Sequence, residues 1–209
     1  MPDHPDSTGR SAPSRGLSLR GEPVAVWRDL VEAFAAATAS SRHPLHLLTV
    51  ATVDADGCPQ ARTVVLRGFD PDRREVVFHT DCRSPKAEQI RGDGRVALHW
   101  YDPGQRLQIR IAAAARIHHG DAIARAAWEA SQRMSRACYL TDVSPGTPLA
   151  EFPAAPMAPA LDDERGLQAF SVVRCRFDSV ELLALSAAGH ERIRLVFTGQ
   201  EPVLEILAP

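Results

Sequence analysis

The 209-residue chain has little of several features that define other protein classes. It contains only four cysteines, Cys58, Cys82, Cys138 and Cys175, and none of them forms a C-x-x-C pair. A disulfide scaffold is denser in cysteine, so we expect reduced thiols in a cytoplasmic protein. No stretch approaches the ~20 apolar residues that a membrane span requires, and we see no apolar core of a secretory signal.

Neither sign of charge is in excess, since 24 Lys and Arg face 26 Asp and Glu, for a formal net charge of −2. Nucleic-acid binders and polybasic membrane-docking proteins usually carry a basic excess, so we expect neither partner. The dinucleotide and Walker phosphate loops, a nucleophile elbow and a zinc motif are also lacking. We therefore expect no metal site.

The chain is expected to fold as one domain that follows a tail. Residues 1–21 are rich in Pro, Ser, Arg and Asp and poor in large apolar residues, which predicts a disordered N-terminal tail. Residues 22–209 form the predicted domain. It opens with a helix from Pro23, in which Val24, Trp27, Leu30, Val31 and Phe34 recur at the spacing of one apolar face.

Extended runs separated by turn signals follow, at 45–53, 60–69, 75–80, 95–101, 106–117, 170–185, 190–197 and 203–207. A short helix after the third run has Ser84 as its expected N-cap and Pro85 at its first position. Residues 121–137 predict another helix, and residues 141–160 a long Pro-rich loop. Short turns join antiparallel strands, and such a meander tends to close. We predict a mainly β fold, an antiparallel six- to eight-stranded β-barrel with flanking helices.

The segment from His79 to Lys86 combines groups that suit a phosphate. A strand ends there and a helix begins, and a helix N-terminus offers free N–H groups and a positive partial charge. Thr80 and Ser84 add hydroxyls, and Arg83 and Lys86 add charge. A plain capped helix with two surface cations remains the alternative.

Three other strand segments carry polar groups in an alternating pattern. On the run from Arg62 to Arg67, Thr63, Val65 and Arg67 face away from Arg62, Val64 and Leu66. Gln108 points opposite to its apolar neighbours, as a residue reading the polar edge of a planar ring does. His190 and Arg192 share one strand face. Solvent-exposed residues of amphipathic strands show the same pattern, so each segment alone leaves both interpretations open.

Taken in order, these segments resemble the pyridoxamine 5′-phosphate oxidase family over about residues 24–209. The motifs that carry the resemblance are Arg62 to Arg67, His79-Thr80, Arg83 to Ile90, Gln108, His190-Glu191-Arg192 and Leu207-Ala208-Pro209. The chain looks closer to the oxidase-related FMN-binding branch than to the true oxidase. The resemblance implies a split β-barrel homodimer with FMN at the subunit interface.

The resemblance also implies roles for individual residues. The implied FMN contacts are Arg62, Thr63, Val64, Val65, Leu66, Arg67, His79, Thr80, Arg83, Ser84, Lys86, Gln108 and, from the partner subunit, Arg192. His190 and Arg67 would face the substrate, and no catalytic acid or base is assigned. FMN would carry the redox chemistry while the protein orients it.

Several departures from the family pattern concern the substrate. Pro85 stands between Ser84 and Lys86 where the true oxidase has Arg, and Ala188 replaces an Arg that helps to hold the substrate. The tryptophan expected near 180–183 is missing, and the Tyr, Arg and Ser that grip the substrate phosphate have no clean match in 128–136. We therefore predict an FMN-dependent oxidoreductase that transfers a hydride from a small substrate other than pyridoxamine phosphate. A non-catalytic flavin-, haem- or deazaflavin-binding module and a true pyridoxamine 5′-phosphate oxidase are the alternatives.

Overall fold

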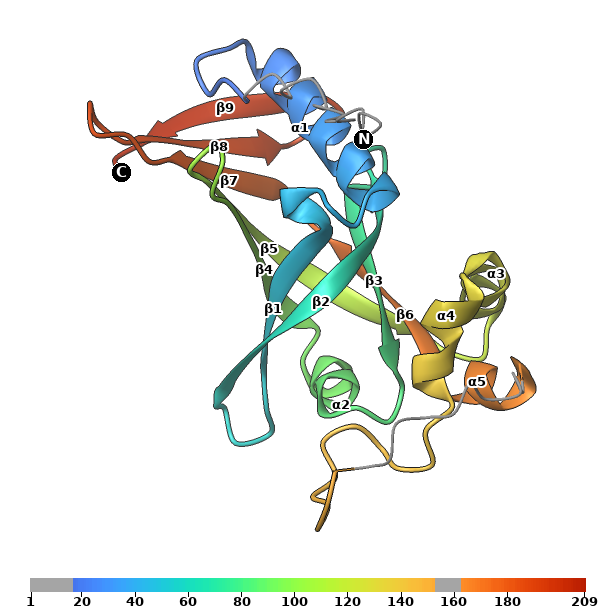
Figure 1. The fold of residues 1–209 in the computed structure, drawn as a ribbon. Helices are drawn as coiled ribbons and strands as arrows, with labels where there is room; N and C mark the ends of the chain where they lie inside the picture. Colours follow the sequence, from blue (N-terminus) through green and yellow to red (C-terminus); the bar gives the residue numbers. More distant parts are fainter. Residues whose placement is uncertain (1–16, 153–162) are drawn as a thin grey trace, which may run out of the picture.

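The computed structural model describes residues 17–152 and 163–209, and its strands form one antiparallel sheet (Figure 1). The strands are β1 (Leu47–Val53), β2 (Pro59–Asp70), β3 (Glu75–Asp81), β4 (Arg95–Asp102), β5 (Leu107–His118), β6 (Phe170–Arg176), β7 (Ser179–Ala184), β8 (Glu191–Phe197) and β9 (Pro202–Leu207). The helices are α1 (Pro23–Ala39), η1 (Pro44–His46), α2 (Pro85–Gly92), α3 (Ala122–Ala130), α4 (Arg133–Arg136), η2 (Ala137–Tyr139) and α5 (Asp163–Ala169).

Strand β5 belongs to both halves of the sheet. The order β4-β1-β2-β3-β6-β5 closes into a six-stranded barrel because β4 also pairs with β5. The first part of β5, Leu107–Arg110, pairs with β7, and its last part, Ala114–His118, pairs with β6. Strands β7, β8 and β9 therefore continue the same sheet outside the barrel, and we call this part the second sheet. This topology confirms the predicted split barrel with flanking helices.

Two predicted elements are each broken into shorter ones in the structure. The break in the predicted strand raises the number of strands to nine. The run expected at 170–185 bends at Phe177-Asp178 and gives β6 and β7. Phe177 is buried and its N–H donates to the Arg74 carbonyl, while the Asp178 carbonyl accepts from the Phe197 N–H. The helix expected at 121–137 ends at Ala130, and α4 and η2 follow it as separate turns.

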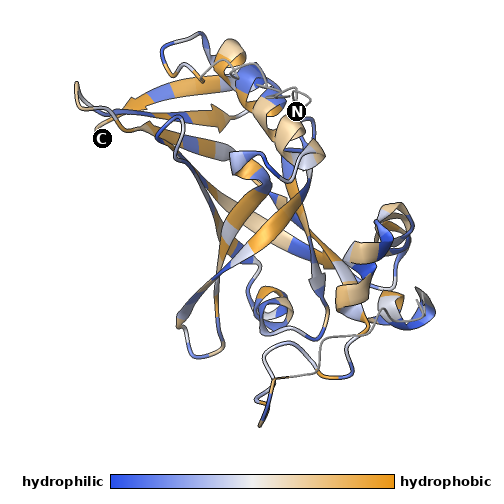
Figure 2. Ribbon diagram, in the orientation of Figure 1, coloured by the Kyte–Doolittle hydropathy of each residue, from blue (hydrophilic) through white to orange (hydrophobic). Residues whose placement is uncertain are grey.

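One core fills the barrel and continues under α1. Alternate residues of the strands point inward, which Figure 2 shows as alternating hydrophobic and hydrophilic bands. Phe34 of α1 stacks on Phe69 with ring centroids 4.5 Å apart, and Trp27 meets Phe197 edge-on at 4.8 Å. Leu30 and Phe34 of the predicted apolar face are buried and Trp27 packs against the core, whereas Val26 and Ala37 are also buried and Val24 is half exposed.

Three further features frame the site. Helix α2 closes one end of the barrel, while α3, α4 and α5 gather beside β6 (Figure 1). Leu19, expected in the tail, is buried in the main core, and residues 1–16 of that tail and 153–160 of the Pro-rich loop lie outside the described residues. Among the helices that the structure describes, none is long and apolar enough to cross a membrane.

Candidate functional site

A cluster of hydroxyl and cationic groups lies where β3 ends and α2 begins. Lys86 Nζ donates a hydrogen bond to Thr80 Oγ1 (3.1 Å), which lies 3.1 Å from Ser84 Oγ. Thr80 and Ser84 are buried. Ser84 is the N-cap and Pro85 follows it, as predicted, but the Ser84 hydroxyl donates to the Asp81 carbonyl (2.7 Å) instead of capping the helix. The first N–H groups of α2 are therefore left without a side-chain cap.

Arg62 reaches the same region from the inner face of β2. Its guanidinium donates to Thr52 Oγ1 (2.6 Å), to the Val50 carbonyl (3.2 Å) and to Gln89 Oε1 (2.9 Å), all of which are uncharged acceptors. Burial lowers the pKa of Arg62. The pKa of Lys86 is also lowered, first by burial and then by the charge of Arg62.

We call these residues the cation cluster: Arg62 and Lys86 with Thr80, Ser84, Thr52 and Gln89. Within residues 17–152 and 163–209, neither cation forms an ion pair with a carboxylate. Two partly buried like charges disfavour each other, and an anion between them offsets both costs. The cluster is therefore a candidate anion site.

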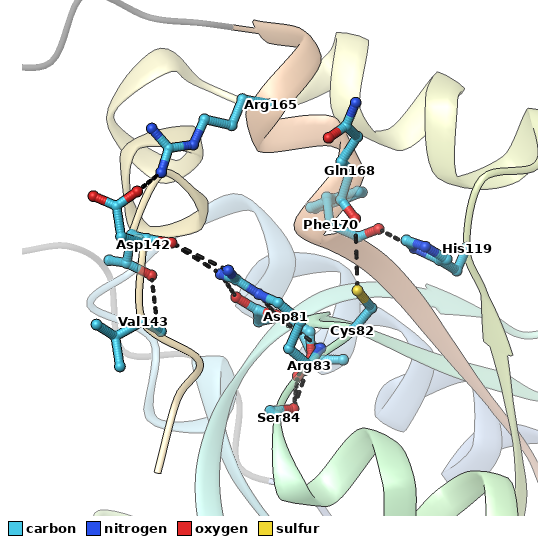
Figure 3. A network of polar contacts seen from close by, with 12 residues as sticks. Asp81, Cys82, Arg83, Ser84, His119, Asp142, Val143, Arg165, Gln168 and Phe170 are labelled. Atoms are coloured by element: carbon cyan, nitrogen blue, oxygen red, sulfur yellow. Dashed lines mark hydrogen bonds and ion pairs between the residues drawn. The ribbon is translucent and has the colours of Figure 1, made fainter. Parts of the chain in front are cut away.

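Arg83, predicted to join the phosphate contacts, forms an ion pair with Asp81 instead (Figure 3). Its Nη2 lies 2.7 Å from Asp81 Oδ2, and its guanidinium also donates to the Thr141 carbonyl (3.2 Å). The bond to Asp81, which is 7% exposed, raises the pKa of Arg83. Nearby, Arg165 pairs with Asp142. Arg83 thus ties the end of β3 to the segment after η2.

Arg67 and His79 lie on the outer face of β2 and β3, in a groove of about 900 Å³. The groove runs between the outer face of β2, β3 and β6 and helix α3. Burial and, to a smaller extent, the charge of Arg67 together lower the pKa of His79 to about 4. His79, which packs edge-on against Phe170, is therefore neutral at pH 7.

Gln108 and Arg192 form a third group on the second sheet. Leu183 is the register partner of both, so the three residues form a row across β5, β7 and β8 and face the same side. Arg192 donates to Glu181 Oε1 (2.8 Å). His190 was expected on this strand but precedes β8, which begins at Glu191, and its Nδ1 accepts from the Ser186 N–H.

The predicted alternation along Arg62 to Arg67 is confirmed by burial: Leu66 lies in the core, Val64 packs against it, and Thr63 and Arg67 are exposed. The buried side chain of Leu66 is therefore not accessible to a ligand.

Sequence reasoning missed the neutral partners that hold the cations in place. Gln89 was overlooked, although it follows Lys86 by three residues and so shares its side of α2. Thr52 pairs with Gln60 on β2, and only this register brings it to Arg62. Glu181, which binds Arg192, had no recognisable signal.

The segment that contains most of these residues is similar to a known protein family. Residues 24–119 match the family model described as pyridoxamine 5′-phosphate oxidase, FMN-binding domain. Over this segment the chain is similar to the pyridoxamine 5′-phosphate oxidase family. The matched segment contains the cation cluster, Arg67, His79 and Gln108, whereas His190 and Arg192 lie beyond it.

Curated relatives match only part of the chain. The pyridoxine/pyridoxamine 5′-phosphate oxidase of Roseobacter denitrificans is 42% identical over 77 residues, 36% of this chain and 36% of the relative. The corresponding Bradyrhizobium enzyme is 32% identical over 105 residues, 50% of this chain and 46% of the relative. The matches therefore span less than half of the length of these relatives.

Solved structures match over most of the length. A pyridoxamine 5′-phosphate oxidase-related, FMN binding protein of Nostoc punctiforme has a TM-score of 0.69 at 25% identity, and the match covers 88% of this chain and 97% of that one. PhzG of Burkholderia lata has a TM-score of 0.65 at 20% identity, covering 86% and 90%. The second likeness concerns the fold alone.

Proposed function

We propose that this protein is an FMN-dependent oxidoreductase that transfers a hydride from a small substrate to FMN. One observation carries the proposal: Arg62 and Lys86 lie together, partly buried, without a carboxylate partner among the described residues. The family match over this segment supports FMN as the anion that they hold.

The cation cluster fits a flavin phosphate by its chemistry. A phosphate monoester carries a charge of about −1.5 to −2 and three strong acceptor oxygens. Lys86 and Arg62 supply two charges, Thr80 supplies a hydroxyl, and the uncapped start of α2 supplies N–H groups. We leave Arg83 out of this set because Asp81 already neutralises it.

We further propose that the flavin site is completed in a homodimer. Gln108 and Arg192 face the outer side of the sheet, while Arg62 faces the inner side, so one chain presents the two groups in opposite directions. The same outer face exposes Leu47 (52%) and Tyr101 (45%), and burying such apolar side chains favours association. A second copy of the chain would bring its own Gln108 and Arg192 to the cation cluster.

The chain's own residues would position the reactants in this mechanism. Bound FMN would supply the redox chemistry by accepting the hydride. Arg67 would hold the substrate in the outer groove, where His79 is uncharged at pH 7 and offers a neutral nitrogen. No carboxylate of the described residues lines that groove, so we assign no general base.

We propose that pyridoxamine 5′-phosphate is a poor substrate. In the groove, α3 presents Ala126, Ala127 and Ala130, which cannot bind a phosphate through their side chains. Each missing charge-assisted contact costs about 1.5–3 kcal/mol, so two losses remove several decades of kcat/KM.

Two measurements test the proposal. The absorption spectrum of the purified full-length protein, with FMN added and excess removed, should show a stoichiometric flavin. Anaerobic bleaching of that flavin should then be sought with a panel of small amines and dihydroaromatic reductants. A protein that retains no FMN contradicts the cofactor, and one that retains FMN but is reduced by none of them is a binding module. Turnover of pyridoxamine 5′-phosphate near one per second, within the ordinary enzyme range of roughly 1–10³ s⁻¹, would restore the oxidase assignment.

A further inference from the structure

The groove beside α3 carries positive charge and no negative charge among its described lining residues. Arg67 forms no hydrogen bond or ion pair with the part of the chain that the structure describes, and it is exposed to the groove. Arg174, on the same wall, lies 3.5 Å from Glu75, and its Nε lacks a hydrogen-bond partner there. One guanidinium is therefore free to bind an anion.

One part of the groove is lined by apolar side chains on both walls, while Thr38, Ser41 and Gln132 are among the polar residues that line the remainder. The α3 side consists of Ile123 and the small residues Ala126, Ala127 and Ala130, and Val77 and Val172 line the strands opposite. Because the side chains of one wall are small and those of the other are β-branched, a slot remains between the walls. A planar ring that binds there would bury its own apolar surface and that of both walls. The Ser131 hydroxyl already donates to the Ala127 carbonyl (2.7 Å).

The groove is poorly equipped for a doubly charged phosphate. Phosphate sites combine several cations with free helix N–H groups. The start of α3 is blocked, because the Asp121 carboxylate accepts from the Ala124 N–H (2.9 Å) and this bond lowers the pKa of Asp121. With the N–H of Ala124 occupied in this way, the groove offers few main-chain donors to a dianion, whereas a single carboxylate needs only one guanidinium.

We propose that this groove binds a flat, largely apolar molecule that carries one carboxylate, with Arg67 as the ion-pair partner of that carboxylate. The inference rests on the proposed function, because such a molecule would be the substrate class of the FMN-dependent enzyme. Arg67 then determines specificity by selecting the charged end of the ligand.

Three probes that share one ring system test the charge requirement: 2-naphthoate, 2-naphthamide and 2-naphthyl phosphate. Their affinities are measured by calorimetry on the full-length protein, with and without added FMN. We expect 2-naphthoate to bind at least about tenfold more tightly than 2-naphthamide, and no more weakly than 2-naphthyl phosphate. In Arg67→Gln the preference for the carboxylate over the amide should fall below about threefold.

The control is Arg73→Gln, which removes an exposed arginine on the β2–β3 turn outside the groove and should leave the preference unchanged. Equal binding of carboxylate and amide by the wild type, or tightest binding of the phosphate, would overturn the inference. Because one chain builds the groove, probe binding without FMN measures the inference even if the cofactor proposal fails. Loss of FMN binding with an intact carboxylate preference contradicts only the proposed function.

Discussion

Arg62 and Lys86 approach one another from different elements, β2 and α2, and each is held only by uncharged acceptors within the described residues. The lowered pKa of Lys86 reflects burial and the neighbouring guanidinium. Because burial and mutual repulsion disfavour both charges in the free protein, binding of an anion between them is favoured. The first prediction follows from this pair.

Replacing Lys86 with methionine should weaken FMN binding by about 1–3 kcal/mol, the range for a hydrogen bond to a charged group. The affinity of the variant for riboflavin, which lacks the phosphate, should stay close to that of the wild type. Fluorescence titration of both flavins measures the difference. Arg95→Gln removes an exposed cation paired with Asp93 just beyond α2 and should alter neither affinity. Equal losses for FMN and riboflavin in the Lys86 variant would show that Lys86 does not contact the phosphate.

Replacing Arg83 with glutamine should destabilise the fold and leave FMN selectivity intact. The change leaves the Asp81 carboxylate, 7% exposed, without its ion-pair partner, which costs about 1–3 kcal/mol. Urea unfolding gives the stability, and the ratio of FMN to riboflavin affinity gives the selectivity. A collapse of that ratio, similar to the one expected for Lys86→Met, would return Arg83 to the phosphate site.

Stability should fall with acidification through the titration of His79. Its pKa is about 4 in the folded protein and 6.5 when unperturbed, because burial and then Arg67 disfavour the charged ring. Between these values the unfolded chain binds a proton that the folded chain does not, so the free energy of unfolding decreases as pH falls below 6.5.

Carboxylates also titrate in the acid range, so the contribution of His79 is isolated by comparing the pH dependence of stability of the wild type with that of His79→Gln. From about pH 7 to pH 4.5 the wild type should lose on the order of 1–2 kcal/mol more stability than the variant. Urea midpoints across that range provide the measurement. Parallel pH profiles for the two proteins would mean that the imidazole is not buried.

Replacing Tyr101 with aspartate should disrupt the proposed dimer and, with it, FMN retention. Tyr101 is the register partner of Gln108, is 45% exposed, and lies on the face that we assign to the second copy. Sedimentation should show a monomer. Met134→Asp places the same charge on an 86% exposed apolar residue of α4, away from that face, and should remain dimeric. A monomeric Tyr101 variant that still holds stoichiometric FMN would exclude a shared site.

Local signals in the sequence predicted much of the fold. Turn residues and alternation located β1 to β5, and Ser84-Pro85 located the start of α2. The break at Phe177-Asp178 was not predicted, because the apolar and β-branched residues on both sides outweighed the two turn-type residues Asp178 and Ser179. Its cause is the burial of the Phe177 ring and two hydrogen bonds to distant segments. Loss of periodicity after Ala130 gave a weak sign that the third helix ends there.

The residues of the candidate site could be predicted from the sequence, but the partners of their side chains could not. The order of motifs pointed to Arg62, Thr80, Ser84 and Lys86, and the structure brings them together. That Arg83 serves Asp81 depends on a side-chain choice between two neighbouring partners, which sequence spacing does not resolve. That Gln108 and Arg192 share a row depends on the register of β7, which joins them through Leu183.

The register of β2 against β3 shifts between Leu66 and Gly68, which leaves Arg67 as an extra, exposed residue at a bulge. A side chain in that position contributes little to packing, so its replacement barely changes the stability of the barrel. Mutation at this one codon can therefore change the charge of the groove while selection for folding is unaffected. The ligand preference of the groove can therefore change faster in descendants of this chain than the residues of the cation cluster can, because Thr80 and Ser84 of that cluster are buried in the fold.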